Sequence, residues 1–156
     1  MALSYEPHYW EDYEIDQKFE SPGRTITDAD LAIHAAFSGD WTEVHTNEEY
    51  AKGTKFGGRV AHGPLTFLVG TGLIVRMGIF ERTVRAFLGM NYMEVTEPVF
   101  AGDTLYLTLE VKDKQRLESR DDEALVVFEC EMTNQDDDIV FKGDLKFLMG
   151  LREAAS

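Results

Sequence analysis

The C-terminal part of the chain alternates apolar and polar residues with a period of two, the period of a β-strand. Three segments carry this pattern, namely Leu105–Val111, Val126–Met132 and Ile139–Phe147. Acidic stretches at residues 118–123 and 136–138 separate them, and we interpret these as solvated turns rather than calcium-binding loops. The pattern predicts an antiparallel meander with one buried face.

The N-terminal part predicts shorter elements. Gln17–Thr27 is typical of a first strand, with Ser21-Pro22-Gly23 ending it. A helix is expected over Asp28–Ser38, because Thr27 or Asp28 can cap it and Gly39 follows its end. Its expected apolar face consists of Ala29, Ile33, Ala36 and Phe37. A helical turn at Asn47–Lys52 and a further strand at Val84–Val95 complete the set.

The helix expected at Pro64–Met77 differs from the first because it is apolar on nearly every side. Such a helix should be buried on most sides, and Pro64 suits its first position, where no N–H is needed. One buried helix beside a long antiparallel sheet predicts an α+β fold in which the sheet wraps around the helix. The length of 156 residues fits a single domain over residues 1–156.

Charge and composition narrow the range of partners. The formal net charge of -14 argues against binding to nucleic acid or to an anionic membrane surface. No apolar stretch has the length of a transmembrane helix, and Met1–Pro7 does not resemble a secretory signal. The single cysteine, Cys130, excludes an internal disulfide and fits a reducing cytoplasm. Its place in an alternating strand indicates a packed thiol rather than a nucleophile.

Two short segments carry the candidate chemistry. Gly39–His45 places the carboxylate of Asp40 and the imidazole of His45 five residues apart, in a stretch too polar for a core element. Gly57–Pro64 then leads into the apolar helix, where Gly63 offers an N–H beside the helix N-terminus. An acid/base pair and a site for developing negative charge are the parts needed to add water to a polarised double bond, or to remove it.

With these elements in order, nearly the whole chain resembles the MaoC-like dehydratases, also described as (R)-specific enoyl-CoA hydratases, which have the hotdog fold. The resemblance rests on Phe19–Thr27, Ser38–His45, Gly58–Gly63 and Pro98–Leu105. The family's hydratase motif is usually Asp-x-Asn-Pro-x-His. Asp40 and His45 match this motif, while Thr42 and Glu43 stand where Asn and Pro are usual.

The resemblance implies reversible hydration of a trans-2-enoyl thioester, on coenzyme A or acyl-carrier protein, to the (R)-3-hydroxyacyl thioester. It implies no metal and no redox cofactor, since coenzyme A is part of the substrate. Asp40 and His45 would activate the water, and the Gly63 N–H would polarise the thioester carbonyl. Thr71 falls where the family places a serine that fixes the aspartate. The family also pairs sheets edge to edge, which implies a homodimer or higher homo-oligomer with sites at the subunit interface.

Each of the remaining candidate residues has an alternative role. His62 is expected to orient or pack rather than to act as a second base. Trp41, Tyr50 and Phe56 can line an acyl pocket or simply pack. Arg59, with Lys52 and Lys55, forms the basic cluster near the motifs, either for an anionic ligand or as surface charge. His8, His34 and His45 have no metal-ligand spacing, so no zinc site is predicted.

Two other functions remain open from the sequence. A hotdog acyl-CoA thioesterase commonly carries a carboxylate on or beside its central helix, and Leu65–Met77 contains no Asp or Glu. A non-catalytic acyl-CoA-binding module would leave the Asp40 and His45 pair without a purpose.

Overall fold

The structure is a computed structural model that describes residues 6–152. The prediction of a single domain over residues 1–156 therefore extends beyond the described part at both ends. Residues 1–5, on which most of the judgement about a secretory signal rests, also lie outside it. None of the helices within residues 6–152 is long and apolar enough to cross a membrane.

Antiparallel pairing joins every strand of the sheet. The path runs β1-β5-β6-β7-β3, with β2 also paired to β5 and β4 to β7. The three predicted C-terminal strands are confirmed, each extending beyond the predicted bounds. The strands are β1 (Lys18–Glu20), β2 (Arg24–Thr25), β3 (Val84–Gly89), β4 (Met93–Val95), β5 (Thr104–Arg116), β6 (Glu123–Thr133) and β7 (Ile139–Gly150).

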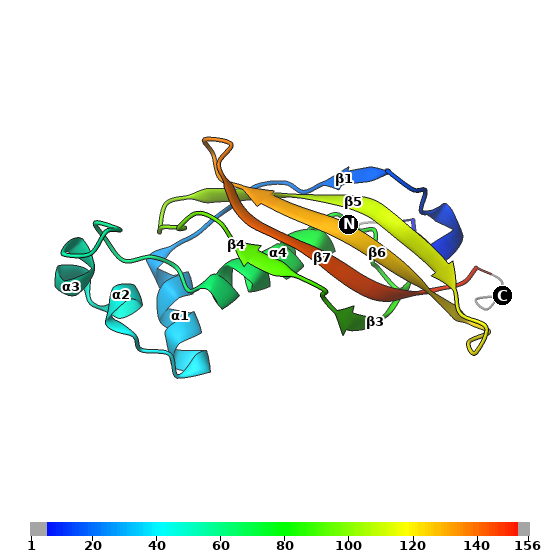
Figure 1. Ribbon diagram of the computed structural model, residues 1–156, viewed down its shortest axis with the longest axis horizontal. Helices are drawn as coiled ribbons and strands as arrows, with labels where there is room; N and C mark the ends of the chain where they lie inside the picture. The colour runs from blue at the N-terminus through cyan, green and yellow to red at the C-terminus, as the bar shows by residue number, and fades with distance from the viewer. Residues whose placement is uncertain (1–5, 153–156) are drawn as a thin grey trace, which may run out of the picture.

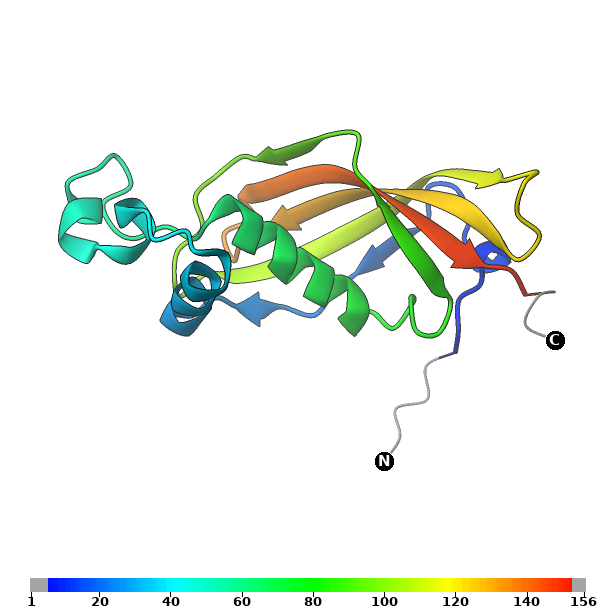
Figure 2. The same ribbon diagram turned by 90° about the horizontal axis from the view of Figure 1, so that it is seen from below.

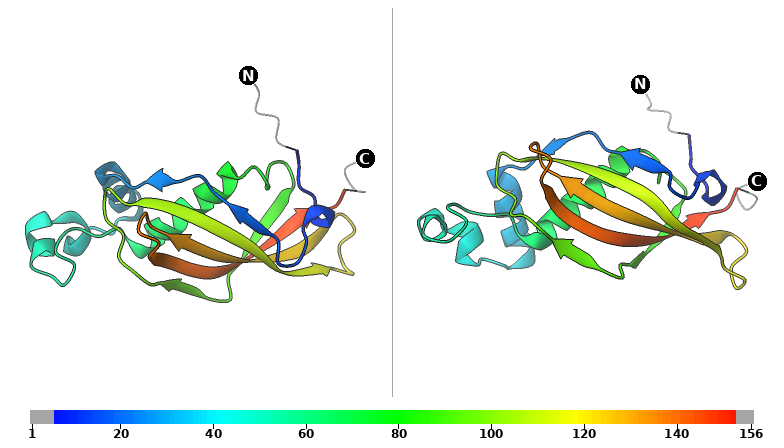
Figure 3. Two further views of the ribbon diagram at one scale, coloured as in Figure 1. Left: turned by 90° about the horizontal axis from the view of Figure 1, so that it is seen from above. Right: turned by 45° about the horizontal axis from the view of Figure 1, so that its top comes forward.

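The helices lie on one side of this sheet and beyond its end (Figure 1). They are α1 (Asp28–Ser38), α2 (Glu43–Thr46), α3 (Glu48–Lys52) and α4 (Gly63–Arg76), after a short 3-10 turn at Trp10–Asp12. Figure 2 shows α4 running across the face around which the sheet curves. Both views of Figure 3 show α1, α2 and α3 projecting past that end of the sheet. We call residues 28–62, which carry these three helices, the overhang.

The core lies between α4 and the strands β5, β6 and β7, as the alternating pattern predicts. Leu73 of α4 is fully buried, and Gly70 lets the helix approach the sheet closely. A Cβ atom at Gly70 would lie 2.9 Å from the sulfur of Met132. Cys130 is buried in this layer, and burial raises the pKa of its thiol to about 12, which agrees with a packed rather than reactive thiol.

Both long apolar helices are less buried than their sequences suggest. In α4, Leu68 is 49% exposed and Val75 is 64% exposed, because the sheet covers only one side of the helix. In α1 the predicted apolar face is not the face that is buried. Phe37 is 90% exposed and Ile33 is 67% exposed, while Leu31, His34 and Ala35 are the buried residues. The overhang packs against α4 through the face of α1 that carries Leu31, His34 and Ala35. No described segment covers the face that carries Ile33 and Phe37.

Two predicted strands are each divided in two. Pro22, which has no N–H to donate, lies in the break between β1 and β2. Between β3 and β4, the backbone N–H groups of Asn91 and Tyr92 turn to the Asp144 carboxylate, at 2.6 Å and 3.0 Å. The acidic stretches predicted as turns do connect strands: residues 117–122 join β5 to β6, and residues 134–138 join β6 to β7.

Candidate active site

Asp40 lies in the loop that leaves α1. The helix ends as predicted at Gly39, whose left-handed backbone (φ 78°) lets its N–H close back on Ala35 O. Asp40 Oδ1 then accepts hydrogen bonds from the Thr42 hydroxyl at 2.5 Å and the Thr42 N–H at 3.1 Å. These bonds, and to a lesser degree the nearby His62 and His45, hold the pKa of the Asp40 carboxyl below its usual value. The site thus holds an exposed, ionised carboxylate.

His45 lies on α2 and is half-buried. Its Nδ1 lies 2.8 Å from the carbonyl oxygen of Val60. Because a carbonyl can only accept, Nδ1 carries the hydrogen in this contact, and the lone pair of the neutral ring is on Nε2. The residue therefore presents a base at Nε2, held in one tautomer by the backbone.

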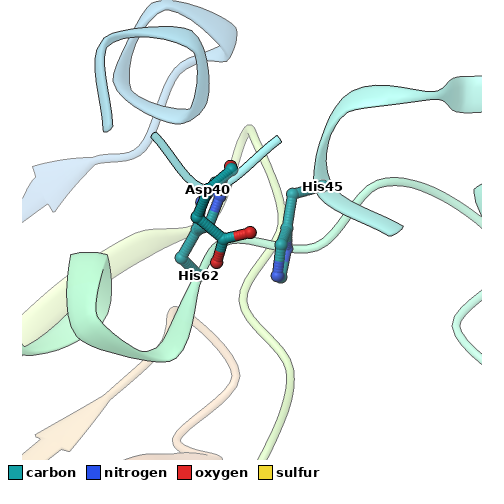
Figure 4. Close-up of side chains that lie close together, drawn as sticks. All are labelled: Asp40, His45 and His62. Carbon is teal, nitrogen blue, oxygen red and sulfur yellow. Dashed lines mark hydrogen bonds between the residues drawn. The ribbon is translucent and has the colours of Figure 1, made fainter. Parts of the chain in front are cut away.

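His62 immediately precedes α4 and is only 1% exposed. Its Nε2 lies 3.0 Å from the Asp40 carbonyl oxygen, and its ring stacks on His45 with 3.8 Å between the ring centroids. Burial, followed by the neighbouring His45 and His34, lowers the pKa of His62. Figure 4 shows the Asp40 carboxylate lying in front of the His62 ring and directed toward His45. The loop after α1, α2 and the entry to α4 thus bring three functional groups together.

The same three residues each offer one potential metal-ligand atom, and these atoms lie within 4.8 Å of one another. Sequence spacing among His8, His34 and His45 does not reveal this grouping. The geometry suits a single ion poorly, because the two rings are stacked with only 27° between their planes. Imidazole lone pairs lie in the ring plane, so stacked rings direct them side by side and not toward one point. The rings would have to turn before both could bind one ion.

A cavity of about 560 Å³ opens beside His45. Its lining includes Val44, His45, Lys55, Phe56, Thr66 and Val95. Thr66 belongs to the first turn of α4, so the positive end of that helix borders the cavity. Gly63 lies at the same place: a Cβ there would meet a methyl group of the cavity-lining Val95 at 3.3 Å. A ligand oxygen in this cavity would face the start of α4.

The other residues predicted to bind a ligand do not all lie at this cavity. Phe56 lines the cavity, whereas Trp41 and Tyr50 are exposed and outside its lining. Arg59 is engaged by Asp28 at 2.7 Å and by Glu48 at 3.0 Å, so it joins the start of α1 to α3. Lys52 pairs with Glu49 at 3.0 Å. Among the ion pairs of residues 6–152 none involves Lys55, which lies over the Phe56 ring at 5.0 Å and lines the cavity.

Thr71 does not reach Asp40 within this chain. Its hydroxyl donates to Leu68 O at 2.7 Å, and eight residues of helix put it about 12 Å along α4 from Gly63. It lines a second cavity of about 410 Å³, which lies between α4 and the strands β3 and β7. Four phenylalanines, Phe67, Phe80, Phe87 and Phe147, contribute to its mostly apolar wall. The predicted bond from Thr71 to Asp40 would therefore need the Asp40 of another copy.

Sequence patterns do not identify two residues that adjoin the site, Thr42 beside Asp40 and His34 behind His62. Thr42 fixes the Asp40 carboxylate, and its position two residues after an aspartate was an available signal, because Asx turns have this spacing. His34 packs against His62 with 4.4 Å between ring centroids and 46° between the ring planes. Nothing in the sequence pattern marks that contact, since it depends on how α1 packs against the entry to α4.

Comparison with known proteins supplies the family. A family model described as the MaoC like domain matches residues 12–130. Protein MaoC of Klebsiella aerogenes is 36% identical over 106 residues, which are 68% of this chain but only 31% of that protein. An (R)-specific enoyl-CoA hydratase of Rhodospirillum rubrum is 33% identical over 109 residues, covering 67% of this chain and 69% of that one.

The solved structures agree with the architecture. A monoamine oxidase regulatory protein from Archaeoglobus fulgius superposes with a TM-score of 0.86 at 29% identity, covering 96% of this chain and 99% of that one. A protein from Mycobacterium tuberculosis described as a double hotdog fold superposes at 0.79 and 21% identity, over 92% of this chain and 44% of that one. The second likeness shows the fold alone, which is the hotdog fold that the sequence predicts.

Proposed function

This chain belongs to the MaoC-like domain family, and on that premise we propose that it is a hydro-lyase acting on enoyl thioesters. The reaction is the reversible addition of water to a trans-2-enoyl thioester, giving the (R)-3-hydroxyacyl thioester. The observation that carries the proposal is the placement of the ionised Asp40 carboxylate beside the free Nε2 of His45, at the rim of a cavity that the start of α4 also borders.

The geometry suggests how each group acts. Asp40 and His45, which we call the dyad, hold one water molecule, and His45 Nε2 takes a proton from it as the oxygen bonds to C3 of the substrate. The electron pair of the double bond moves to the thioester oxygen. The Gly63 N–H and the helix dipole stabilise that charge. Protonation at C2 returns the proton and completes the addition. The reaction is redox-neutral, and the proposal includes no metal and no cofactor apart from the coenzyme A of the substrate.

We further propose that the active species is a homodimer with shared sites. Thr71 and the apolar cavity lie well along α4 from the dyad of the same chain. β3 forms one end of the sheet path, and its exposed apolar residues include Val84, Phe87 and Leu88. An uncovered edge of this kind favours pairing with another chain. A second copy can bring its own dyad to this cavity, which would then hold the acyl chain, while Lys55 faces the anionic part of coenzyme A.

Two alternative functions make different predictions. A hotdog thioesterase would need a carboxylate to activate hydrolytic water, and α4 carries no Asp or Glu. A silent binding module would have no use for the hydrogen bonds that fix the tautomer of His45 and the charge of Asp40.

The deciding experiment uses crotonyl-CoA with the purified protein. We expect the absorbance of the enoyl thioester to decay without release of free thiol, and chiral analysis of the product to give the (R)-3-hydroxyl. Thiol release would identify a thioesterase, and binding without either change would identify the silent module; both results would overturn the proposal. Light scattering on the same sample should give at least a dimer, and an active monomer would end the shared-site model.

A further inference from the structure

Three imidazole rings pack in succession from α1 into the site, and we call this row of His34, His62 and His45 the stack, in which the planes of His62 and His45 differ by 27° and those of His34 and His62 by 46°. His34 contacts His62 with 4.4 Å between centroids, and His62 contacts His45 with 3.8 Å. His62 is 1% exposed and lies in the middle of the stack, outside the lining of the cavity beside His45. It is therefore placed to act on the dyad and not on a ligand in that cavity.

The hydrogen bonding of His62 determines its protonation state. Its Nε2 must carry the hydrogen, because the Asp40 carbonyl at 3.0 Å can only accept. Its Nδ1 is buried and has no partner among the described residues. A second proton on Nδ1 would create a buried donor without an acceptor, which is costly. Burial and the two neighbouring rings lower the pKa of His62, in the same direction. A neutral ring also adds no repulsion when His45 gains a proton during the reaction.

His62 therefore touches both members of the dyad in different ways. Its N–H holds the main chain of Asp40, and its ring face limits how the His45 ring can turn. The bond from His45 Nδ1 to Val60 O fixes the direction of Nε2 along one axis only. A ring held by one hydrogen bond can still rotate about it, and a stacked neighbour removes that freedom.

We propose that His62 is a positioning residue of the dyad, a neutral imidazole that fixes the Asp40 main chain by a hydrogen bond and the His45 ring plane by stacking. This inference rests on the proposed hydration for its kinetic consequences. Its structural consequence, the restrained ring of His45, can be measured independently of any activity.

Two variants separate the two contacts. His62→Gln keeps an N–H donor close to the position of Nε2 and removes the ring, whereas His62→Phe keeps a ring and removes the donor. We expect each to lower kcat on crotonyl-CoA about 10–100-fold, because small misplacements of catalytic groups cost about that much. KM should change less than about threefold, because His62 is outside the cavity that would hold the substrate. His34→Phe is the matched control, since it preserves the outer contact of the stack and touches neither Asp40 nor His45, and it should keep nearly normal kcat.

A second measurement does not depend on turnover. The His45 Hε1 resonance should carry a ring-current shift from His62, lost in His62→Gln and retained in His62→Phe and His34→Phe.

The inference fails if either His62 variant turns over within about threefold of wild type, if KM rises as much as kcat falls, or if His34→Phe is equally damaging. It also fails if the His45 resonance is the same in wild type and His62→Gln. If His62→Gln does not fold, the kcat and KM of His62→Phe test the inference. A wild type without hydratase activity would refute the proposed function, while the resonance would still test the stack.

Discussion

The layer of α4 and the sheet differs sharply from the overhang in how its residues are held. Every inward residue of β6 from Ala124 to Met132 is at most 2% exposed, and Leu73 of α4 is fully buried. In the overhang, α2 has no buried residue, and Phe37 and Trp41 are 90% and 60% exposed. The first region is held by apolar packing, and the second mainly by directed polar contacts. Apolar packing in the first region therefore supplies most of the stability, while the candidate site is in the second.

The overhang keeps its shape through a small number of named contacts. Thr27 and Asp30 form a capping box at the start of α1, and Asn47 caps α3 through the N–H of Tyr50. Arg59 joins α1 to α3, and the His62 N–H holds the loop at Asp40. Because each contact is local, a substitution here can disturb the dyad without unfolding the core.

The largest expected effect comes from the dyad itself. Asp40→Asn removes the charge and His45→Ala removes the base, so each should lower kcat by roughly 10²–10⁴. Both side chains are on the overhang, and we expect the thermal midpoint of unfolding to stay close to that of wild type. Steady-state kinetics tests the expected fall in kcat, and a melting curve on the same preparation tests the expected thermal midpoint. Near-normal turnover by either folded variant would remove that residue from the mechanism.

The opposite result is expected from the core. Phe128 is fully buried and contacts the rings of Tyr13 and Phe80. Phe128→Ala should therefore lower the free energy of unfolding by about 3–5 kcal/mol, with normal turnover per folded molecule. Urea denaturation measures the free energy of unfolding. Active-site titration counts the active molecules, so that turnover can be given per folded molecule.

Phe37→Ala is the matched control in the overhang. Phe37 is 90% exposed, so its loss should leave the unfolding free energy of a single chain almost unchanged. If it destabilises the chain as much as Phe128→Ala does, the contrast between the two regions is wrong. A weaker dimer with unchanged chain stability would instead place Phe37 at a subunit contact.

The sequence predicted the core much better than the surroundings of the dyad. Strict alternation in β5 and β6 fixes which residues face inward, so these strands and their buried faces could be read directly. The capped helix at Asp28–Ser38 has the bounds that were predicted, because Thr27 and Gly39 are local signals. The burial of α1 was not predictable in this way, since its apolar residues Ile33 and Phe37 face outward and His34 faces inward.

The same distinction applies to the site. Asp40 and His45 were predicted because their spacing is a motif, and Gly63 because it was expected just before a helix; in the structure Gly63 is the first residue of α4. Arg59 was predicted, from its charge, either to face an anionic ligand or to be surface charge, whereas its partners Asp28 and Glu48 lie 31 and 11 residues away in the chain. Contacts over such separations follow from tertiary packing, which charge patterning along one chain does not report.

A smaller effect is expected from Arg59→Met, which keeps the apolar stem and deletes the ion pairs of Arg59 with Asp28 and Glu48. We expect a fall in kcat of about 3–10-fold, because Val60 and His62 follow directly and share the segment that Arg59 holds. Exposed ion pairs add little stability, so the melting temperature should fall by no more than about 2–4 °C. Lys52→Met is the control, since it deletes only the pair with Glu49. Equal kinetic loss in both variants would refute a bracing role for Arg59.

The smallest effect should come from Thr71→Val, which keeps the shape of the side chain and removes its hydroxyl. Within residues 6–152 of one chain that hydroxyl bonds only to Leu68 O, so chain stability should barely change. If a second copy brings its dyad to the apolar cavity, the hydroxyl can also hold the partner's carboxylate, and kcat should fall by up to about tenfold. Thr83→Val, which removes a buried hydroxyl without a partner among the described residues, controls for general effects of the exchange. Turnover of Thr71→Val equal to that of wild type would mean that the overhang and the cavity along α4 do not meet through this residue, even in a dimer.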